Sequence, residues 1–323
     1  MKIDDRVYGE WEIQEGVLLD LINCKSVQRL EGLAQYGLPN QYYHKKGFSR
    51  LEHSIGVMIF LRKFNARIEE QIAGLIHDVS HTAFSHVVDW AIGDPEKEDF
   101  QDKNHINVIE NSEIPKILEH YGFGYADVID LEKFSLLEKH APSLCGDRID
   151  YTLREVATDG EGEIAKRLFY FLRTRNGDLF FDNVEVAEEF GKMYSNLNKN
   201  HWAGVEARTR YYLLANILKI GFDKNFISYS DLYRTDLELI NLLYSSRDKQ
   251  IIEELDFLKN KKIAKQSDNG KGIYLRKKYR WIDPEVLEDG KIKRLSELSP
   301  DYKLFLKEEK FFLESNSYSE VLK

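Results

Sequence analysis

The amino-acid sequence predicts a mainly α-helical fold with small β elements and an α/β segment at its C-terminal end. Apolar residues recur at helical spacing along most of the chain, as Ile55, Ile59 and Phe60 do. Strand-like runs are short, at residues 3–15 and around residue 180, and each contains or follows a glycine. The 323 residues, 42% of them hydrophobic, are enough to bury a full core.

Composition narrows the class of protein. The net charge of −9 disfavours broad binding to nucleic acid, although a local basic groove stays compatible with it. Two cysteines, Cys24 and Cys145, are too few for a disulfide framework and predict reduced thiols in a cytoplasmic protein. The first residues, MKIDDRVYGEW, are too polar for a signal peptide. Because no apolar run approaches the ~20 residues that cross a bilayer, we expect no membrane partner.

The first predicted helix covers residues 17–37, where leucines and an isoleucine fall at helical intervals before Gly37. Gln28 lies on this helix, and its simplest interpretation is a solvated surface residue. A turn at Pro39 and a polar loop then lead to Arg50.

Residues 49–89 carry the chemistry-bearing side chains. Two predicted helices pack together and bring His53 near the adjacent His77 and Asp78. His81 lies one helical turn after His77, so we expect both side chains on one face. A single histidine on an apolar face is more often a core residue than a ligand. Imidazoles gathered with a carboxylate, however, suit a divalent cation.

Two later segments add candidates. Asp147, Tyr151 and Glu155 fall at i, i+4 and i+8, along one stripe of a predicted helix. Residues 93–104 form a charged loop, and His105 follows it at the start of another predicted helix. A surface histidine is the alternative interpretation of His105.

The last third of the chain changes character. Residues 193–221 predict a helix pair, or one helix broken near Gly204. From residue 264 the runs SDNGKG, IYLRKKYRWID and EDGKIKRL indicate turns and strands. We therefore divide the chain into a domain of residues 1–263 and a C-terminal α/β appendage of residues 264–323.

A basic run in the appendage extends from Lys271 to Arg280 and is interleaved with Tyr274, Tyr279 and Trp281. It could bind nucleic acid or an acidic partner. We favour the other interpretation, the solvated face of a strand.

Four motifs carry a resemblance to a known family: SVQRLEGLAQYGL, SRLEHSIGV, AGLIHDVSHTAFSH and GDRIDYTLRE. The order His53, His77-Asp78, Asp147 resembles the H…HD…D pattern of the HD-domain metal-dependent phosphohydrolases. The wider match, from about residue 3 to about residue 262, is similar to their deoxynucleoside triphosphate (dNTP) triphosphohydrolase branch. It implies that the larger domain is an HD-domain helical bundle.

The resemblance implies a metal site. His53, His77, Asp78 and Asp147 would supply two nitrogen and two oxygen ligands to one divalent ion. Mixed imidazole and carboxylate ligands suit Mn, Fe, Ni or Zn, and Mg less well.

Catalytic roles are implied for three residues nearby. His81 and His105 would move protons or stabilise charge, because histidine titrates near neutrality. Asp89 would orient one of these two histidines. The alternative is that His81 and His105 bind a second metal ion, as in binuclear relatives.

Substrate contacts follow from the same resemblance. Gln28 would lie near the base or sugar of a nucleotide, and Arg50 and Arg148 would face its phosphate. Tyr151 and Glu155 would line the cleft. In relatives the position of Glu155 commonly holds aspartate and contacts the ribose, and glutamate is longer.

The family also places an arginine and a tyrosine on a later helix, where they hold the phosphates and sugar. This sequence has no clear counterpart. Lys192, Tyr194 and His201 are the candidates.

Three functions are compatible with these observations. The first, which we favour from the sequence, is a dNTP triphosphohydrolase that releases deoxynucleoside and tripolyphosphate; Gln28, Arg50, Tyr151 and the run SHTAFSH support it. The second is a phosphatase or phosphodiesterase for a nucleoside monophosphate, cyclic nucleotide or other phosphate ester. The third is a non-catalytic HD protein that binds nucleic acid or a partner, which the intact ligand set argues against. The resemblance further implies a homo-oligomer, at least a dimer.

Overall fold

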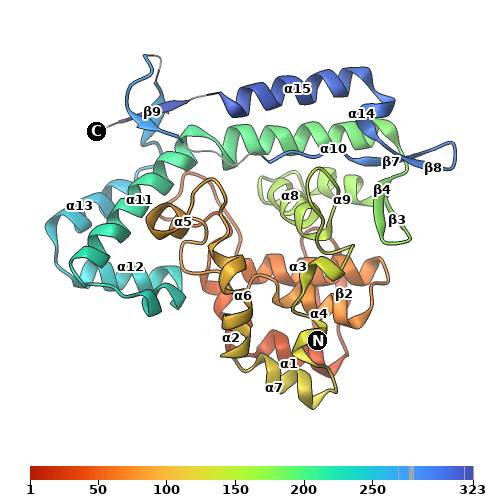
Figure 1. The fold of residues 1–323 in the computed structure, drawn as a ribbon, viewed down its shortest axis with the longest axis horizontal. Coiled ribbons are helices and arrows are strands. Elements are labelled where there is room, and N and C mark those ends of the chain that lie inside the picture. Colours follow the sequence, from red (N-terminus) through yellow and green to blue (C-terminus); the bar gives the residue numbers. More distant parts are fainter. Residues whose placement is uncertain (268, 276–279, 316, 323) are drawn as a thin grey trace.

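Helices form most of the structure, which confirms the predicted mainly α class (Figure 1). The computed structural model describes residues 1–267, 269–275, 280–315 and 317–322. The α-helices are α1 (Gly16–Asn23), α2 (Lys25–Gln28), α3 (Arg50–Lys63), α4 (Ile68–Ile76), α5 (Val87–Ile92), α6 (Phe100–Glu110), α7 (Ile114–His120), α8 (Gly146–Thr158), α9 (Gly162–Tyr170), α10 (Val184–Leu197), α11 (Val205–Asp223), α12 (Asp236–Ser245), α13 (Lys249–Leu258), α14 (Leu295–Leu298) and α15 (Pro300–Glu314). Single turns of other helix types are η1 (Arg29–Gly32), η2 (Tyr125–Asp127), η3 (Leu131–Lys133), η4 (Asn198–Trp202, π-helical) and η5 (Tyr229–Tyr233).

The strands form small sheets at the edges of the helical body. They are β1 (Lys2–Asp5), β2 (Gly9–Glu12), β3 (Leu172–Arg175), β4 (Asp178–Phe181), β5 (Ala264–Gln266), β6 (Ile273–Tyr274), β7 (Glu285–Glu288), β8 (Lys291–Arg294) and β9 (Tyr318–Val321). Their orders are β1-β2, β3-β4-β7-β8 and β5-β9-β6. The predicted strands at the N-terminus, near residue 180 and in the C-terminal segment are thus confirmed.

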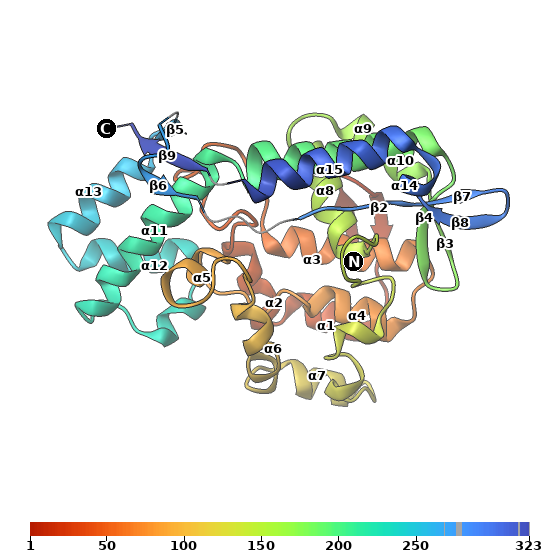
Figure 2. The same cartoon turned by 45° about the horizontal axis from the view of Figure 1, so that its top comes forward.

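The helices lie in layers. Both views show α10 and α15 side by side along one edge, with α11, α12 and α13 at one end (Figures 1 and 2). Helices α1, α3 and α4 lie on the other side of the molecule, and α8 lies between them and α10.

The prediction of one continuous helix over residues 17–37 is wrong, because the structure has two shorter helices and a turn there. The structure breaks it at Cys24, whose ψ of 155° is extended, and continues it as α2 and the turn η1. The backbone N–H of Ser26 donates to Glu113 Oε1 at 2.9 Å, and its hydroxyl donates to the other oxygen. A carboxylate from a distant segment therefore starts a new helix where periodicity alone suggested a continuous one.

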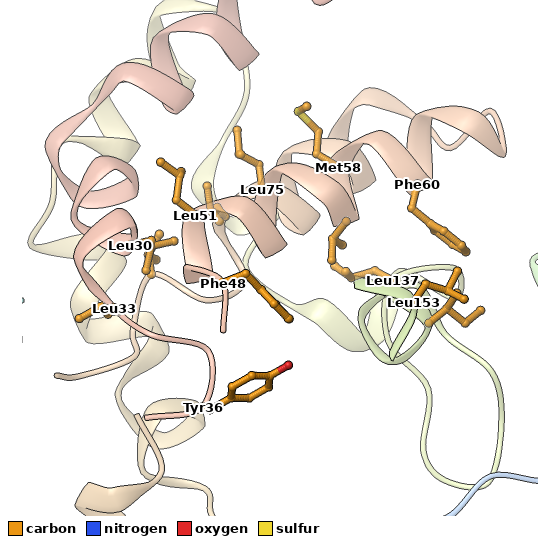
Figure 3. Close-up of a cluster of buried hydrophobic side chains, with 14 of the residues drawn as sticks. Leu30, Leu33, Tyr36, Phe48, Leu51, Met58, Phe60, Leu75, Leu137 and Leu153 are labelled. Carbon is orange, nitrogen blue, oxygen red and sulfur yellow. The ribbon is translucent and has the colours of Figure 1, made fainter. Parts of the chain in front are cut away.

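The core under the motifs is the contact of α3 with α4 and α8, where Leu75 and Leu153 are buried (Figure 3). Ser49 caps the start of α3 through its hydroxyl. Gly56 lets α8 approach, because a Cβ there would lie 1.8 Å from Nη2 of Arg154. Each buried leucine contributes roughly 1.5–3 kcal/mol, so this packing fixes the helices that carry the site.

Two details of the central motif differ from prediction. Helix α4 ends at Ile76, so His77 and His81 do not share a helix; Phe84 and Ser85, a little further on, have positive φ values of 62° and 49°. His105 lies in the middle of α6 rather than at the start of a helix, because α6 begins at Phe100 within the predicted loop. Local turns, which apolar periodicity does not report, decide both positions.

The later predictions hold better. Gly204 separates the π turn η4 from α11, so the predicted helix break is confirmed. Strands β7 and β8 form a hairpin around Asp289 and Gly290, as EDGKIKRL predicts. Of the basic run, residues 276–279, and Tyr279 with them, lie outside the described residues, while Tyr274 is exposed.

The C-terminal segment is joined to the rest of the molecule. Strand β7 pairs in parallel with β4, through Phe181 and Val286. Tyr302 on α15 is fully buried and lies where a side chain at Gly191 on α10 would be. A boundary at residue 263 therefore cuts across a shared sheet and a shared core.

Two expectations from composition can be compared with the structure. Cys24 and Cys145 are both free and buried. Among the helices that the structure describes, none has the length and apolarity needed to cross a membrane.

Candidate functional site

One cavity of about 740 Å³ brings together most of the predicted site residues. Its walls include eight of them: Arg50, His77, Asp78, His81, His105, Asp147, Arg148 and Tyr151. His53 is fully buried behind this wall and reaches Asp147. Gln28, Asp89 and Glu155 do not line the cavity.

His53, His77 and Asp147 form a group that could hold a metal ion, and we call this group the metal cluster. Their ligand atoms all lie within 4.8 Å of one another. Asp147 Oδ1 is 2.9 Å from His53 Nε2 and 3.5 Å from His77 Nε2. These are the atoms that imidazole and carboxylate ligands present to a divalent ion.

Neighbouring acceptors orient both histidines of the metal cluster. His53 Nδ1 is 2.7 Å from Asp150 Oδ2, and Arg154 holds that carboxylate through two hydrogen bonds. His77 Nδ1 is 2.7 Å from the carbonyl oxygen of Gly74. With Nδ1 protonated, each ring turns its Nε2 lone pair toward Asp147. His77 Nε2 is buried and has no hydrogen-bond partner among the described residues, so the donor set fits a metal ion.

The electrostatics of the metal cluster also suit a cation. Burial opposes charge on His53, but hydrogen bonds with Asp147 and Asp150 raise its pKa to about 9. Burial likewise opposes charge on Asp147, yet its hydrogen bond with His53 and the nearby ring of His77 hold its pKa well below its usual range. The cluster therefore binds a proton where a metal ion would place its charge.

Asp78 lies beside the metal cluster, and its two carboxylate oxygens contact different side chains. Its Oδ2 accepts a hydrogen bond from Arg50 Nη1 at 2.7 Å. Its Oδ1 is 3.4 Å from His77 Nε2 and 3.3 Å from His81 Nε2. Arg50 is only 3% exposed and also donates to Ser85 Oγ at 2.8 Å. One oxygen of Asp78 thus faces the cluster while the other fixes Arg50.

His81 and His105 are neutral in these surroundings. Burial and the charge of Arg50 lower the pKa of His81 to about 4. Burial and His77 lower the pKa of His105 to about 4. His105 Nδ1 contacts Ser80 Oγ at 3.2 Å, and its Nε2 has no partner among the residues described. Both imidazoles are therefore uncharged at neutral pH, and each keeps a lone pair on one ring nitrogen.

Asp89 differs from its expected position. Its Oδ2 lies 3.4 Å from Nδ1 of His86, and its Oδ1 accepts a hydrogen bond from the backbone of Phe100 at 3.0 Å. It therefore orients His86, whose ring contacts that of His81 at 5.1 Å, rather than His81 or His105 directly. The turn after His81 causes the difference.

Gln28 and Glu155 are turned away from the cavity. Gln28 Nε2 donates to the carbonyl oxygen of Ile22 at 2.7 Å. Glu155 accepts hydrogen bonds from His201 Nδ1 at 2.5 Å and from Trp202 Nε1 at 2.6 Å. Asp147, Tyr151 and Glu155 all lie on α8, as the spacing predicts. The carboxylate of Glu155, however, is bound by His201 and Trp202 of the turn η4.

Arg148 and Tyr151 reach the cavity with partly engaged polar groups. Arg148 Nη1 donates to the carbonyl oxygen of Ser143 at 2.6 Å. The hydroxyl of Tyr151 contacts that of Tyr194 at 2.9 Å. Tyr194 also lines the cavity. Lys192 does not, and it pairs with Glu188 on another face of α10.

Sequence reasoning missed much of the cavity wall. The additional lining residues include Tyr36, Tyr43, Glu98, Trp202, Arg208, Tyr211, Arg280 and Trp281. They come from loops, from η4, from α11 and from the C-terminal segment. Asp150 was also missed, although its place three residues after Asp147 on a predicted helix was a usable signal.

A second hollow, of about 790 Å³, lies over α10 and contains none of the motif residues. Glu185, Glu188 and Glu189 are among the carboxylates that line it. Because the described residues that line it include no histidine and no aromatic side chain, we place the chemistry in the first cavity.

Known proteins resemble this chain along most of its length. A sequence model described as the HD domain matches residues 50–134. The chain is 38% identical over 294 residues to the uncharacterized protein YdhJ of Bacillus subtilis, covering 90% of each. It is 29% identical to the metal-dependent phosphohydrolase cns2 of Cordyceps militaris, covering 89% of this chain and 85% of that protein. It is 25% identical to a deoxynucleoside triphosphate triphosphohydrolase SAMHD1 homolog of Dictyostelium discoideum, covering 90% of this chain and 62% of that protein.

Solved structures share the fold. A hypothetical protein from Aquifex aeolicus has a TM-score of 0.62 at 20% identity, covering 94% of this chain and 93% of that chain. A phosphohydrolase from Bacteroides thetaiotaomicron has a TM-score of 0.70 at 18% identity, covering 93% and 94%. At these identities the likeness concerns the fold alone.

Proposed function

Because this chain belongs to the HD-domain family of metal-dependent phosphohydrolases, we propose that it hydrolyses a phosphate ester bond of a nucleotide inside the cavity. The main observation behind the proposal is that the metal cluster and several aromatic side chains line the same cavity. Tyr36, Tyr43 and Trp202 are among these aromatic residues. Aromatic faces suit a nucleobase, and the metal cluster suits a phosphate.

His53, His77 and Asp147 would hold the metal ion, and Oδ1 of Asp78 would complete the set. A divalent ion bound there polarises a phosphoryl oxygen and lowers the pKa of water. The mixed ligands favour Mn, Fe, Ni or Zn over Mg, and a second ion near His81 and His105 is the binuclear alternative.

The remaining residues have distinct roles in the proposal. His105 accepts a proton, because its buried imidazole is neutral and its Nε2 is available. His81 faces Asp78 and stabilises charge beside it. Arg50 and Arg148 bring positive charge to the phosphate side of the cavity.

Two versions of this function make different demands on the nucleoside. A dNTP triphosphohydrolase, as the sequence motifs suggest, would use Gln28 and Glu155 to hold base and sugar. Both side chains are engaged elsewhere and neither lines the cavity. Phosphatase or phosphodiesterase activity on another nucleotide requires neither contact, so the geometry favours this second version.

A substrate panel tests the proposal. The purified protein with Mn²⁺ is offered dNTPs, NTPs, nucleoside monophosphates and cyclic nucleotides, alone and in mixtures, and products are separated by chromatography. We expect orthophosphate release or ring opening from a nucleotide. Release of nucleoside and tripolyphosphate from dNTPs would support the other version, and no hydrolysis of any nucleotide would overturn the proposal.

Assembly into a homo-oligomer, at least a dimer, is part of the proposal. Large apolar side chains on α15, such as Leu304 at 57% and Phe311 at 79% exposure, support it. Light scattering of the purified protein tests it, and a monomer at micromolar concentration would contradict it.

A further inference from the structure

Asp236, the first residue of α12, lies outside the cavity but holds two segments that contribute to its wall. It is 1% exposed and is not among the residues that line the cavity. Its Oδ1 accepts a hydrogen bond from the backbone N–H of Phe84 at 2.8 Å, and its Oδ2 accepts one from the backbone N–H of Ala34 at 2.8 Å. Helix α12 itself lies at one end of the molecule, beside α11 and α13 (Figure 1).

The start of α12 does not depend on the carboxylate of Asp236. Thr235 caps this helix through its hydroxyl, which accepts a hydrogen bond from the N–H of Glu238. The carboxylate of Glu238 in turn accepts one from the N–H of Thr235 at 2.8 Å. A buried carboxylate is costly unless donors match its oxygens, and both donors of Asp236 come from other segments. Its role is therefore to hold those segments.

One of the two segments is the turn after His81, which has an unfavourable backbone. Phe84 and Ser85 have φ values of 62° and 49°, in the left-handed region that residues other than glycine seldom adopt. Such a turn persists only where its neighbours hold it. Besides Asp236, the carbonyl oxygen of Leu232 in η5 does so, by accepting a hydrogen bond from the N–H of Ala83 at 2.7 Å.

Both segments meet at the side chain of Arg50. Ser85 Oγ, from the turn, accepts a hydrogen bond from Arg50 Nε at 2.8 Å. The carbonyl oxygen of Gln35, the residue after Ala34, accepts one from Arg50 Nη2 at 3.4 Å. Arg50 Nη1 donates to Asp78 Oδ2 at 2.7 Å, so the guanidinium that lines the cavity is oriented from both segments.

We propose that Asp236 is a positioning residue of the site, whose carboxylate holds Phe84 and Ala34 together and thereby fixes the direction of the Arg50 guanidinium beside Asp78. It acts through Ser85 and Gln35, without touching substrate or metal ion. Its effect on hydrolysis rests on the proposed function, whereas the positioning itself does not. No sequence motif reports this role, because Asp236 is 152 residues away from Phe84 in sequence.

A double-mutant cycle with Ser85 tests the proposal. Burial raises the pKa of Asp236 to about 7, so assays at pH 8 keep the wild-type carboxylate charged. Asp236→Asn turns one acceptor into an amide donor that faces a backbone N–H, and Ser85→Ala removes the acceptor for Arg50. Each change should lower kcat/KM roughly tenfold, with the same split between kcat and KM, because both act through one guanidinium.

The double variant should lose no more activity than the weaker single variant, since coupled residues are not additive. Losses that multiply would overturn the proposal, and so would full activity of Ser85→Ala. Should Asp236→Asn not fold, Asp236→Glu replaces it in the cycle with the same expectation, because the extra methylene displaces both oxygens but keeps their charge.

Asp248→Asn is the matched control. Asp248 belongs to the same end of the molecule, and its carboxylate also accepts hydrogen bonds from two backbone N–H groups, but both belong to its own helix, α13. This change should leave kcat/KM unaltered. A loss equal to that of Asp236→Asn would attribute the effect to general loosening of α12 and α13 and overturn the positioning role.

Amide hydrogen exchange, followed by NMR, separates this inference from the proposed function, because it needs neither substrate nor metal ion. Asp236→Asn should speed the exchange of the Phe84 and Ala34 amides together, roughly tenfold or more, and leave the amides of α8 unchanged. If no nucleotide is hydrolysed but both amides exchange faster, the proposed function fails and the positioning role stands. If nucleotides are hydrolysed and either amide exchanges as in the wild type, the positioning role fails alone.

Discussion

The metal cluster and a second charged cluster, formed by Glu98, Arg208 and Arg280 and called the arginine cluster below, line one cavity but are held in opposite ways. In the metal cluster, acceptors outside the cavity take the Nδ1 protons of His53 and His77, and the Nε2 atoms face a carboxylate. In the arginine cluster, Glu98 already occupies both guanidinium groups. The first arrangement needs a cation from outside, whereas the second carries its own counter-ion. Loss of one member should therefore disable the metal cluster and only retune the arginine cluster.

The largest effect is expected from Asp147→Asn. The change removes the carboxylate oxygen that lies between His53 and His77. Bound metal should be lost, and kcat/KM should fall by at least roughly a thousandfold, because metal activation supplies several kcal/mol. Elemental analysis and hydrolysis assays measure both. Asp182→Asn, which removes a surface partner of Arg173, is the control. A variant that retains metal and rate would break the comparison.

His105→Ala should have the next largest effect. It tests whether a residue beside the metal cluster takes part in catalysis without binding the metal ion. The ring offers an Nε2 without a partner among the described residues, yet it is not part of the metal cluster. We expect retained metal and a kcat lower by roughly 10²–10⁴-fold, as for a lost acid–base group. His120→Ala, on the surface end of α7, is the control. Loss of a metal equivalent would instead assign His105 to a second ion.

Asp150→Asn tests the orientation of the metal cluster from behind. Its carboxylate fixes the ring of His53 without touching the cavity. Metal affinity should weaken by about 10–100-fold, the usual cost of losing such a partner. Competition with a fluorescent chelator measures it. Asp5→Asn is the matched control, because Asp5 also pairs with Arg154 but does not contact His53. Equal losses in both variants would show that the helix packing, and not the imidazole, is responsible.

The smallest effects concern stability against pH in EDTA, where the two clusters should act in opposite directions. His53 has its pKa raised to about 9, so its contribution is complete below the unfolded value of 6.5 and is lost as pH rises through 9. Burial opposes charge on Glu98, but Arg280 and Arg208 hold its pKa well below its usual value. Its contribution is present above the unfolded value, about 4.3, and is lost as pH falls.

Urea unfolding at a series of pH values gives the free energy of unfolding as a curve with an acid limb, where stability falls at low pH, and an alkaline limb, where it falls at high pH. His53→Gln should flatten the alkaline limb, by on the order of 3 kcal/mol at most, and Glu98→Gln should flatten the acid limb. The comparison would be broken if both variants altered the same limb.

The same contrast explains what the sequence could predict. The members of the metal cluster sit in short motifs on α3, after α4 and on α8. Residue type and spacing pointed to His53 and His77, and the resemblance to a known family added Asp147. Glu98 lies in a charged loop, Arg208 close to a second arginine of α11, Arg210, and Arg280 at the end of a basic run. Only tertiary packing unites them, and no local periodicity reports that.

The helices were predictable in existence and less so in extent. The break at Cys24 depends on Glu113, which is 87 residues away from Ser26 in sequence. Glu155 has the spacing of a cleft residue, yet His201 and Trp202 from the turn η4 take its carboxylate. In each case a distant polar partner overrides a correct local pattern.

The pairing of β4 with β7 has a consequence for the solubility of the chain after proteolysis. A polypeptide cut before residue 264 would leave one edge of β4 unpaired and would uncover the face of α10 that packs on Tyr302. Unpaired strand edges and bare apolar faces promote aggregation. Proteolytic removal of residues 264–323 should therefore yield an insoluble fragment rather than a more open enzyme. The C-terminal segment therefore covers a strand edge and a helix face that the rest of the chain leaves open.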